Sequence, residues 1–196
     1  MIPRSFFERD PVTCARELIG CELIWEACAG IIVETEAYAA ANDEACHTFV
    51  RPSARAFVAT HRAGDAYVYF SYGVHWMLNV LVKGGDADGF VLIRALEPTS
   101  GIREMARRRF PARAETIALA DPRTLCSGPG KLAQALGVTG NDHGRNLCSG
   151  IRVGFRQCEK SIVVRADLRV GISKAAHFPW RFLAEGSRFI SARPRQ

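Results

Sequence analysis

The stretch that most constrains the fold is Gly-Ile-Ile-Val-Glu-Thr-Glu-Ala-Tyr, residues 30–38, because an apolar run typical of a strand ends in two carboxylates and a phenol. Successive side chains of an extended chain point to opposite faces, so Ile32, Glu34, Glu36 and Tyr38 share one face of the predicted strand. Two acids at this spacing lie about 7 Å apart. An acid beside aromatic surface is a candidate general base or an acid of raised pKa. The alternative is an exposed edge strand with solvated charges.

The chain is large enough to bury a sizeable core, with 196 residues of which 48% are hydrophobic. We interpret residues 1–196 as a single domain. No run approaches the roughly 18 to 20 apolar residues of a membrane span, and residues 1–9 lack a signal-peptide pattern. We therefore expect a soluble, intracellular protein. Seven cysteines without a Cys-x-x-Cys pair argue against a disulfide framework and against a zinc ribbon.

The net charge of +6 is unevenly distributed. Residues 1–100 carry 8 Lys/Arg and 13 Asp/Glu, whereas residues 101–196 carry 18 and 7, for net charges of −5 and +11. A basic second half indicates a polyanionic partner, with nucleic acid ahead of an acidic membrane. The alternative is an arginine-rich composition that reflects base usage in the genome. We predict DNA-backbone contacts for Arg107 and Arg108 in a basic run, and for Lys131 at the start of a helix, where free amides could seat a phosphate.

Cap and turn residues divide the chain into short elements. Asp10-Pro11 begins a helix that ends before Gly20, and residues 21–25 and 31–36 form a hairpin around a turn at 26–30. Thr99 or Ser100 caps a helix that reaches Arg109. Residues 39–55 are expected to be a loop or a broken helix. Short strands are expected at 151–155, 161–166, 169–172 and 188–191.

Two aromatic-rich strands, residues 65–72 and 74–83, meet near Tyr72-Gly73, which places Tyr72 at a turn. A further apolar run at 90–96 contains a lone Arg94. An arginine in a buried strand needs an acidic partner, and Glu34 or Glu36 is the nearest candidate of that kind.

The histidines and cysteines give only weak signals. The five histidines, at positions 47, 61, 75, 143 and 177, show neither His-x-x-x-His nor His-Glu-x-x-His spacing, so we predict no metal site. A Cys46-His47 nucleophilic pair is weaker still, because adjacent residues rarely face each other. The tyrosines fit either strand core or a surface that stacks bases. The residues alone therefore indicate an α+β enzyme that acts on a polyanion.

Six motifs, in their order and near spacing, resemble the alkyladenine DNA glycosylase family, also called the mammalian-type 3-methyladenine DNA glycosylases. They are residues 33–38 (Val-Glu-Thr-Glu-Ala-Tyr), 43–47 (Asp-Glu-Ala-Cys-His), 67–73 (Tyr-Val-Tyr-Phe-Ser-Tyr-Gly), Asn79, 94–98 (Arg-Ala-Leu-Glu-Pro) and 125–132 (Leu-Cys-Ser-Gly-Pro-Gly-Lys-Leu). The resemblance implies a single α+β domain with a curved, mainly antiparallel sheet surrounded by helices. It also implies an enzyme without metal or organic cofactor that excises damaged purines from double-stranded DNA.

The resemblance assigns catalytic roles to a few positions. Glu36 matches the general base that deprotonates a water for attack on the sugar C1′ carbon. Arg94 and the main-chain carbonyl of Val170 match groups that hold this water. Tyr72 matches the side chain that intercalates into the duplex and fills the gap left by the extruded base.

The remaining matches describe the base pocket. Tyr38, His47 and Tyr69 match residues that sandwich the flipped base, with the His47 main chain donating or accepting a hydrogen bond. Asn79 matches a residue that discriminates against the exocyclic amino group of guanine. The chain departs from the family at Ile31, where relatives often have a basic residue, at Ala56, where they often have asparagine, and at His75, where some have tyrosine.

The resemblance implies base excision repair of 3-methyladenine, 7-methylguanine, hypoxanthine and ethenoadenine by a monofunctional, monomeric enzyme. The compact length resembles that of bacterial members, which implies a cytoplasmic, nucleoid-associated protein. Two alternatives remain open from the sequence. One is a non-catalytic damaged-DNA-binding protein with the same pocket, and the other is an unrelated acid/base hydrolase of a small phosphorylated substrate.

Overall fold

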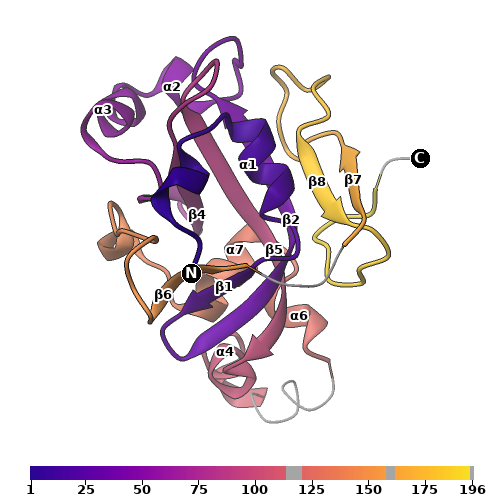
Figure 1. Cartoon of the computed structure of the whole chain (residues 1–196). Coiled ribbons are helices and arrows are strands. Elements are labelled where there is room, and N and C mark those ends of the chain that lie inside the picture. Colours follow the sequence, from indigo (N-terminus) through magenta and orange to yellow (C-terminus); the bar gives the residue numbers. More distant parts are fainter. Residues whose placement is uncertain (114–120, 158–161, 195–196) are drawn as a thin grey trace.

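The computed structural model describes residues 1–113, 121–157 and 162–194 (Figure 1). The described strands form one eight-stranded sheet in the order β3-β4-β5-β2-β1-β6, with β8 beside β2 and β7 beside β8. Each pair of neighbouring strands is antiparallel. The long strands β2 (Cys28–Ala39) and β5 (Gly89–Ser100) pair at the centre of this sheet. The predicted α+β class with an antiparallel sheet is confirmed.

The shorter elements complete the sheet and its covering layers. The strands are β1 (Glu22–Trp25), β3 (Ala66–Ser71), β4 (His75–Val82), β6 (Val153–Arg156), β7 (Val164–Asp167) and β8 (Arg181–Ala184). The helices are α1 (Pro11–Glu17), α2 (His47–Val50), α3 (Pro52–Thr60), α4 (Ile102–Arg109), α6 (Arg123–Cys126) and α7 (Pro129–Leu136), with 3-10 turns η1 (Arg4–Phe7), η2 (Pro111–Arg113) and η3 (Gly140–Asp142).

Helices cover the central strands on both faces. Figure 1 shows α1 in front of β2 and β5, and α7 on the other side, where it packs against β4 and β5. The α1 helix begins as predicted, because the Asp10 side chain accepts a hydrogen bond from Thr13 N at 2.8 Å and Pro11 occupies the first turn. The Thr35 hydroxyl donates to the Ala15 carbonyl at 2.8 Å and so ties β2 to α1. This face of β2 is core, which leaves Glu34, Glu36 and Tyr38 to the other face.

The register between β2 and β5 shifts on both sides of Glu34. Ile32 pairs with Leu96, Glu34 with Ala95, and Thr35 with Ile93, so the ladder skips Val33 on one strand and Arg94 on the other. Bulges of this kind re-aim side chains and recur beside active sites. Here the irregularity places the Arg94 guanidinium against two carboxylates of β2. The alternation in the sequence could not predict it.

Several expected boundaries were wrong. The hairpin turn comprises only residues 26–27, because β2 already starts at Cys28, and α4 is capped by Gly101 because β5 continues through Ser100. Residues 169–172 and 188–191 are not strands, whereas β8 was missed. Strand β8 begins with Arg181, which is buried and forms an ion pair with Glu34. Because a charged residue usually indicates an exposed segment, the sequence did not indicate a core strand here.

The polar segment 39–55 was better interpreted as a broken helix than as a loop. It contains α2 and the start of α3, which continues to Thr60.

Residue 161, the start of one expected strand, lies outside the described residues, as does Cys158. The other six cysteines are free thiols, and five of them are buried. Within the described ranges, no helix is long and apolar enough to cross a membrane.

Candidate active site

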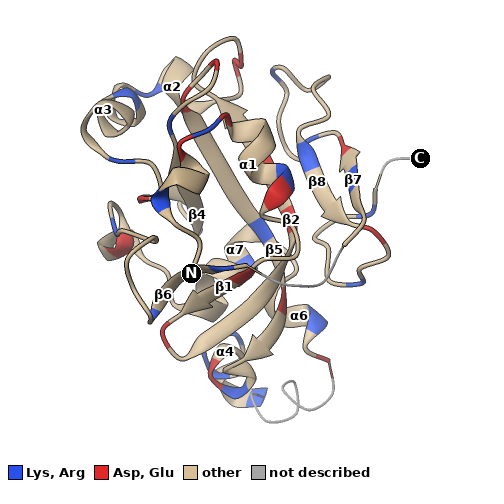
Figure 2. Cartoon of the chain, in the orientation of Figure 1, with Lys and Arg blue, Asp and Glu red and all other residues tan. Residues whose placement is uncertain are grey.

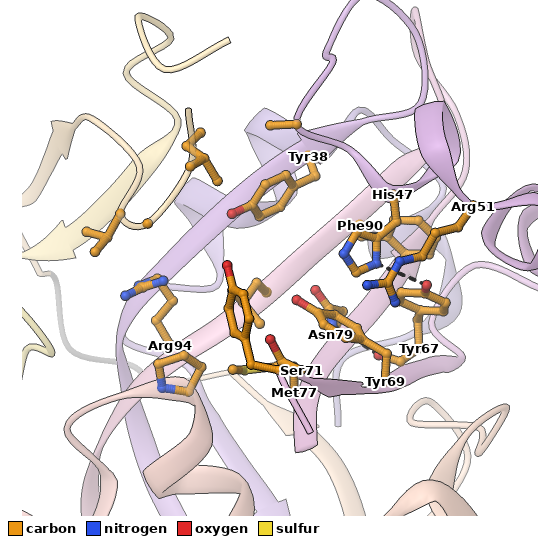
Figure 3. A pocket seen from close by; sticks show the side chains of 17 residues that line it. Tyr38, His47, Arg51, Tyr67, Tyr69, Ser71, Met77, Asn79, Phe90 and Arg94 are labelled. Carbon is orange, nitrogen blue, oxygen red and sulfur yellow. Dashed lines mark hydrogen bonds between the residues drawn. The ribbon is translucent and has the colours of Figure 1, made fainter. Parts of the chain in front are cut away.

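A cavity of about 430 Å³ opens where β2, β3, β4 and β5 meet the loop at residues 170–172 and the start of α7. This volume is in the range of small-molecule sites in proteins. Figure 3 shows aromatic side chains from several elements around it, with Tyr38 across the cavity from His47 and Tyr69. The structure thus brings together the side chains predicted to form a base pocket.

The wall opposite Tyr38 is built from His47 and two tyrosines of β3. The His47 ring meets the Tyr69 ring edge-on at a centroid distance of 4.3 Å, and His47 Nδ1 lies 3.1 Å from the Tyr67 hydroxyl. Burial, with a smaller contribution from Arg51, lowers the pKa of His47 to about 4. Burial raises the pKa of Tyr69 to about 12. Both rings are therefore neutral near pH 7.

Asn79 lies deeper, on β4. It is buried, and its Nδ2 donates to the Tyr67 carbonyl at 3.1 Å while the residue also lines the cavity. Phe90 stacks against Tyr67 at a centroid distance of 4.3 Å and supports it from β5. Neither Tyr67 nor Phe90 was predicted to line the pocket. Period-2 alternation along β3 could have selected Tyr67, since it shares a face with Tyr69.

Glu36 is fully buried, and the three residues that hold its carboxylate all line the cavity. Its Oε1 accepts from the Val170 amide N at 2.7 Å. Its Oε2 accepts from the Tyr38 hydroxyl at 2.8 Å and from Arg94 Nη1 at 3.2 Å. All three groups donate hydrogen bonds, which suits an ionised carboxylate. Such a carboxylate has about four acceptor sites, so Oε1 can still accept a hydrogen bond from a water.

Glu34 has a different environment, although it lies two residues away on the same strand. Its carboxylate accepts from Arg94 Nε at 2.8 Å, from Arg181 Nε at 2.9 Å, and from both the amide and the hydroxyl of Ser191, at 2.5 and 2.7 Å. Burial alone would raise the pKa of Glu34, but Arg94 and the Ser191 amide lower it overall. Glu34 is thus a fully satisfied anchor for Arg94, and the predicted arginine–carboxylate pairing is confirmed for both acids.

A buried ion pair supports Tyr38 from behind. Arg169 donates to Asp43 through two nitrogens at 2.6 and 2.8 Å, and both side chains are inaccessible to solvent. The Arg169 guanidinium also lies 4.7 Å from the Tyr38 ring centroid and 5.2 Å from that of Trp180. No spacing in the sequence indicated this pair, because its members are 126 residues apart. It fixes the ring that forms one wall of the cavity.

Tyr72 lies at the tip of the β3–β4 hairpin, as predicted. It has a positive φ of 50°, and the residue is 94% exposed. Val74 and Phe70 are also exposed at this tip. A left-handed backbone at a bulky non-glycine residue is rare and often marks functional sites. The tip therefore presents apolar groups beside the cavity, which Tyr72 also lines.

The basic residues predicted to contact DNA lie on neighbouring helices, and they differ in how far their side chains are already held by other groups of the protein. Figure 2 shows Lys and Arg on α4 and α6, at one end of the long strands. Arg107 on α4 is largely exposed, with Glu104 at 3.5 Å, and Lys131 is exposed on α7. Arg108 instead donates to the carbonyls of Ala135 and Leu136 at the end of α7, so it has a structural role. Its contact with DNA stays a prediction, as do those of the other two.

Comparison with known proteins agrees with this geometry. The family model described as "Methylpurine-DNA glycosylase (MPG)" matches residues 5–188. The chain belongs to the methylpurine-DNA glycosylase family. Members of this family are hydrolases of N-glycosyl bonds that act on DNA, and the resemblance noted from the six motifs is confirmed.

Several bacterial proteins are similar to this chain over nearly its whole length. Two Rhodopseudomonas palustris proteins are 45% and 46% identical over 97% of the chain, covering 88% and 90% of their own lengths. A protein of Agrobacterium fabrum is 42% identical over 97% of the chain and 92% of its own length. Each carries a provisional name as a 3-methyladenine DNA glycosylase. This family membership removes the unrelated phosphohydrolase as an interpretation.

Among the described residues, no three His, Cys, Asp or Glu side chains gather as they would around a metal ion. None of the three departures from the family pattern is among the groups that hold the Glu36 carboxylate. Ile31 lines a separate surface groove, Ala56 is exposed on α3, and His75 packs where Gly130 leaves room for its ring.

Proposed function

We propose that this enzyme flips damaged purines out of double-stranded DNA and hydrolyses their N-glycosidic bonds in base excision repair. The observation that carries the proposal is the Glu36 carboxylate, held by Tyr38, Arg94 and Val170 against an aromatic cavity large enough for a base. The substrates we expect are 3-methyladenine, 7-methylguanine, hypoxanthine and ethenoadenine. We further propose that the enzyme works as a monomer in the cytoplasm, on nucleoid DNA.

Extrusion of the base has a cost that the cavity can offset. Rotating a nucleotide out of the duplex costs a few kcal/mol, and least for a damaged or mispaired base. Stacking on aromatic side chains contributes about 1 to 3 kcal/mol per base. Tyr38 on one wall, with His47 and Tyr69 on the other, supplies these faces, and Tyr72 fills the gap in the duplex. Asn79, which also lines the cavity, would discriminate against guanine through its exocyclic amino group.

Glu36 supplies the chemistry in this proposal. Cleavage of the bond from the base to C1′ leaves a sugar with oxocarbenium character, which a nearby negative carboxylate stabilises. The same carboxylate takes a proton from the attacking water as a general base. Arg94 and the carbonyl of Val170 orient that water, while the Val170 N–H fixes the Glu36 side chain.

A direct test is release of free base from duplex DNA that contains 7-methylguanine or hypoxanthine, with chelator present. We expect stoichiometric release of the base and an abasic site with an intact backbone. The alternative is a non-catalytic damaged-DNA-binding protein with the same pocket. Specific binding of damaged duplex without any base release would favour that alternative and refute the catalytic proposal.

A further inference from the structure

Ser191 brings the segment that follows β8 back to the carboxylates of β2. Its hydroxyl donates to Glu34 Oε1 at 2.7 Å and accepts from Arg94 Nη2 at 3.1 Å. Arg94 lines the cavity (Figure 3), whereas Ser191 is not among the described residues that line it. The Ser191 hydroxyl therefore contacts the arginine from outside the wall of the cavity.

The three nitrogens of the Arg94 side chain are held by three different groups. Nε donates to Glu34 at 2.8 Å, Nη1 to Glu36 at 3.2 Å, and Nη2 to Ser191. A guanidinium is a rigid planar fork, so the contacts at Nε and Nη2 together set the direction in which Nη1 points. Without the hydroxyl, the contact between Nε and Glu34 is the one left on that side, and the plane of the guanidinium can turn about it. The contact of Nη1 with Glu36 then weakens.

The position of Ser191 is fixed by contacts that do not involve its hydroxyl. Its amide donates to Glu34 Oε2 at 2.5 Å, and the carbonyl of the next residue, Ala192, accepts from Arg181 Nη2 at 2.6 Å. Phe189 is buried and belongs to the hydrophobic core. Removal of the hydroxyl alone therefore leaves the segment in place and isolates the contact with Arg94.

We propose that Ser191 is a positioning residue that orients the Arg94 guanidinium toward Glu36 and the attacking water. This inference rests on the proposed function, because Arg94 holds the water in that mechanism. Since Ser191 is outside the wall of the cavity, it acts through Arg94 on the hydrolysis step. Binding and extrusion of the base depend instead on the aromatic walls and on Tyr72. Loss of the Ser191 hydroxyl should therefore slow hydrolysis without weakening the binding of damaged DNA.

The test is single-turnover excision from duplex DNA that contains hypoxanthine or 7-methylguanine, at saturating enzyme, with a gel-shift titration of the same duplex. Misplacement of a reacting group by about 1 Å can cost about 100-fold in rate, and Ser191→Ala leaves two of the three contacts of Arg94, so we expect a rate about 10-fold below the parent. The dissociation constant should stay within about twofold of the parent value, because the contact acts on the transition state. Ser191→Thr keeps a hydroxyl on the same carbon and should restore the rate to within about threefold of the parent.

Ser187→Ala is the matched control, because Ser187 lies on the same segment and its hydroxyl accepts from the Phe189 amide at 3.2 Å. This variant removes a hydroxyl without changing a contact of Arg94, so it should excise at the parent rate. Urea midpoints show whether each variant is folded under the assay conditions. Should Ser191→Ala fail to fold, Ser191→Cys replaces it, because a thiol fills the space of the hydroxyl but is a weak donor and a weak acceptor.

A folded Ser191→Ala, or Ser191→Cys in its place, that excises at the parent rate would overturn the inference. The same holds if Ser191→Thr is as slow as Ser191→Ala, or if Ser187→Ala slows excision equally, because the effect would then come from loosening of the whole segment. In each of these cases the parent still releases the base, so the proposed function stands. A parent enzyme that releases neither base would instead refute the proposed function, and the inference with it.

Discussion

The Asp43–Arg169 pair offers a stability test of the way the site is supported. Asp43→Asn keeps the shape of the side chain but leaves the Arg169 charge without a counter-ion in a place with no solvent. Removal of one partner from a buried pair costs about 3 to 5 kcal/mol. Arg169 also donates to the carbonyls of Ala37 and Ala175 at 2.9 and 3.0 Å, and these two hydrogen bonds would still stabilise its charge in the variant. We therefore expect a loss of about 3 kcal/mol in the free energy of unfolding.

Urea denaturation followed by tryptophan fluorescence measures this loss, and Trp180 lies against the Arg169 guanidinium as a local reporter. Glu44→Gln is the matched control, because Glu44 adjoins Asp43 in sequence but pairs with Lys174 on the surface, where both side chains are mostly exposed. A surface pair is worth about 0 to 1 kcal/mol. If Asp43→Asn costs no more than Glu44→Gln, the buried pair does not support Tyr38 as described.

Three further predictions follow from other parts of the site. Tyr72→Ala should keep the parent urea midpoint, because the residue is 94% exposed and contributes little to the core. The variant should lose the signal of a fluorescent base analogue that reports flipping, and unchanged flipping would exclude the wedge role of Tyr72. Binding to undamaged duplex should weaken steeply between about 50 and 200 mM salt. The decrease should be less steep in a variant without Arg107 and Lys131. The folded-state pKa of His47 is about 4 against an ordinary 6.5, so the unfolded chain binds that proton more readily. Stability should therefore fall as pH drops from 6.5 toward 4, and His47→Asn should flatten this slope in the pH profile of urea midpoints.

Patterns local in sequence predicted the parts of the fold that local physics decides. The Asp10-Pro11 start of α1, the exposed turn at Tyr72 and the strand character of residues 30–38 each depend on a few adjacent residues. The need of Arg94 for an acidic partner also followed from the cost of burying a charge. The family motifs then supplied the residues of the pocket.

What the sequence could not show depends on contacts between distant segments. The buried Arg181 in β8 and the Arg169 pair with Asp43 look like ordinary surface charges in the sequence, and only tertiary structure shows that they are enclosed. The bulges around Glu34, which let one arginine bridge two carboxylates, have no local signal. The place of Arg51 at the cavity was not predicted either, because a charged residue in a polar segment is usually solvated and only the fold brings its guanidinium to 5.4 Å from the Tyr69 ring centroid.

The role of Glu36 is the central claim, and substitution by glutamine tests it most directly. Glutamine keeps the length of the side chain but removes the basicity and the negative charge. Glu34→Gln is the control, because Glu34 shares the strand and Arg94 but is bound to Arg181 and Ser191. This control should lower stability while the folded enzyme remains active.

The decisive measurement is single-turnover excision of hypoxanthine or ethenoadenine from duplex DNA, with a gel-shift titration of the same substrates. For Glu36→Gln we predict unchanged binding of damaged DNA and base release slower by roughly 10² to 10⁴-fold, the range expected for loss of a general base. Release at the parent rate by Glu36→Gln, or an inactive Glu34→Gln that still folds and binds, would contradict the account.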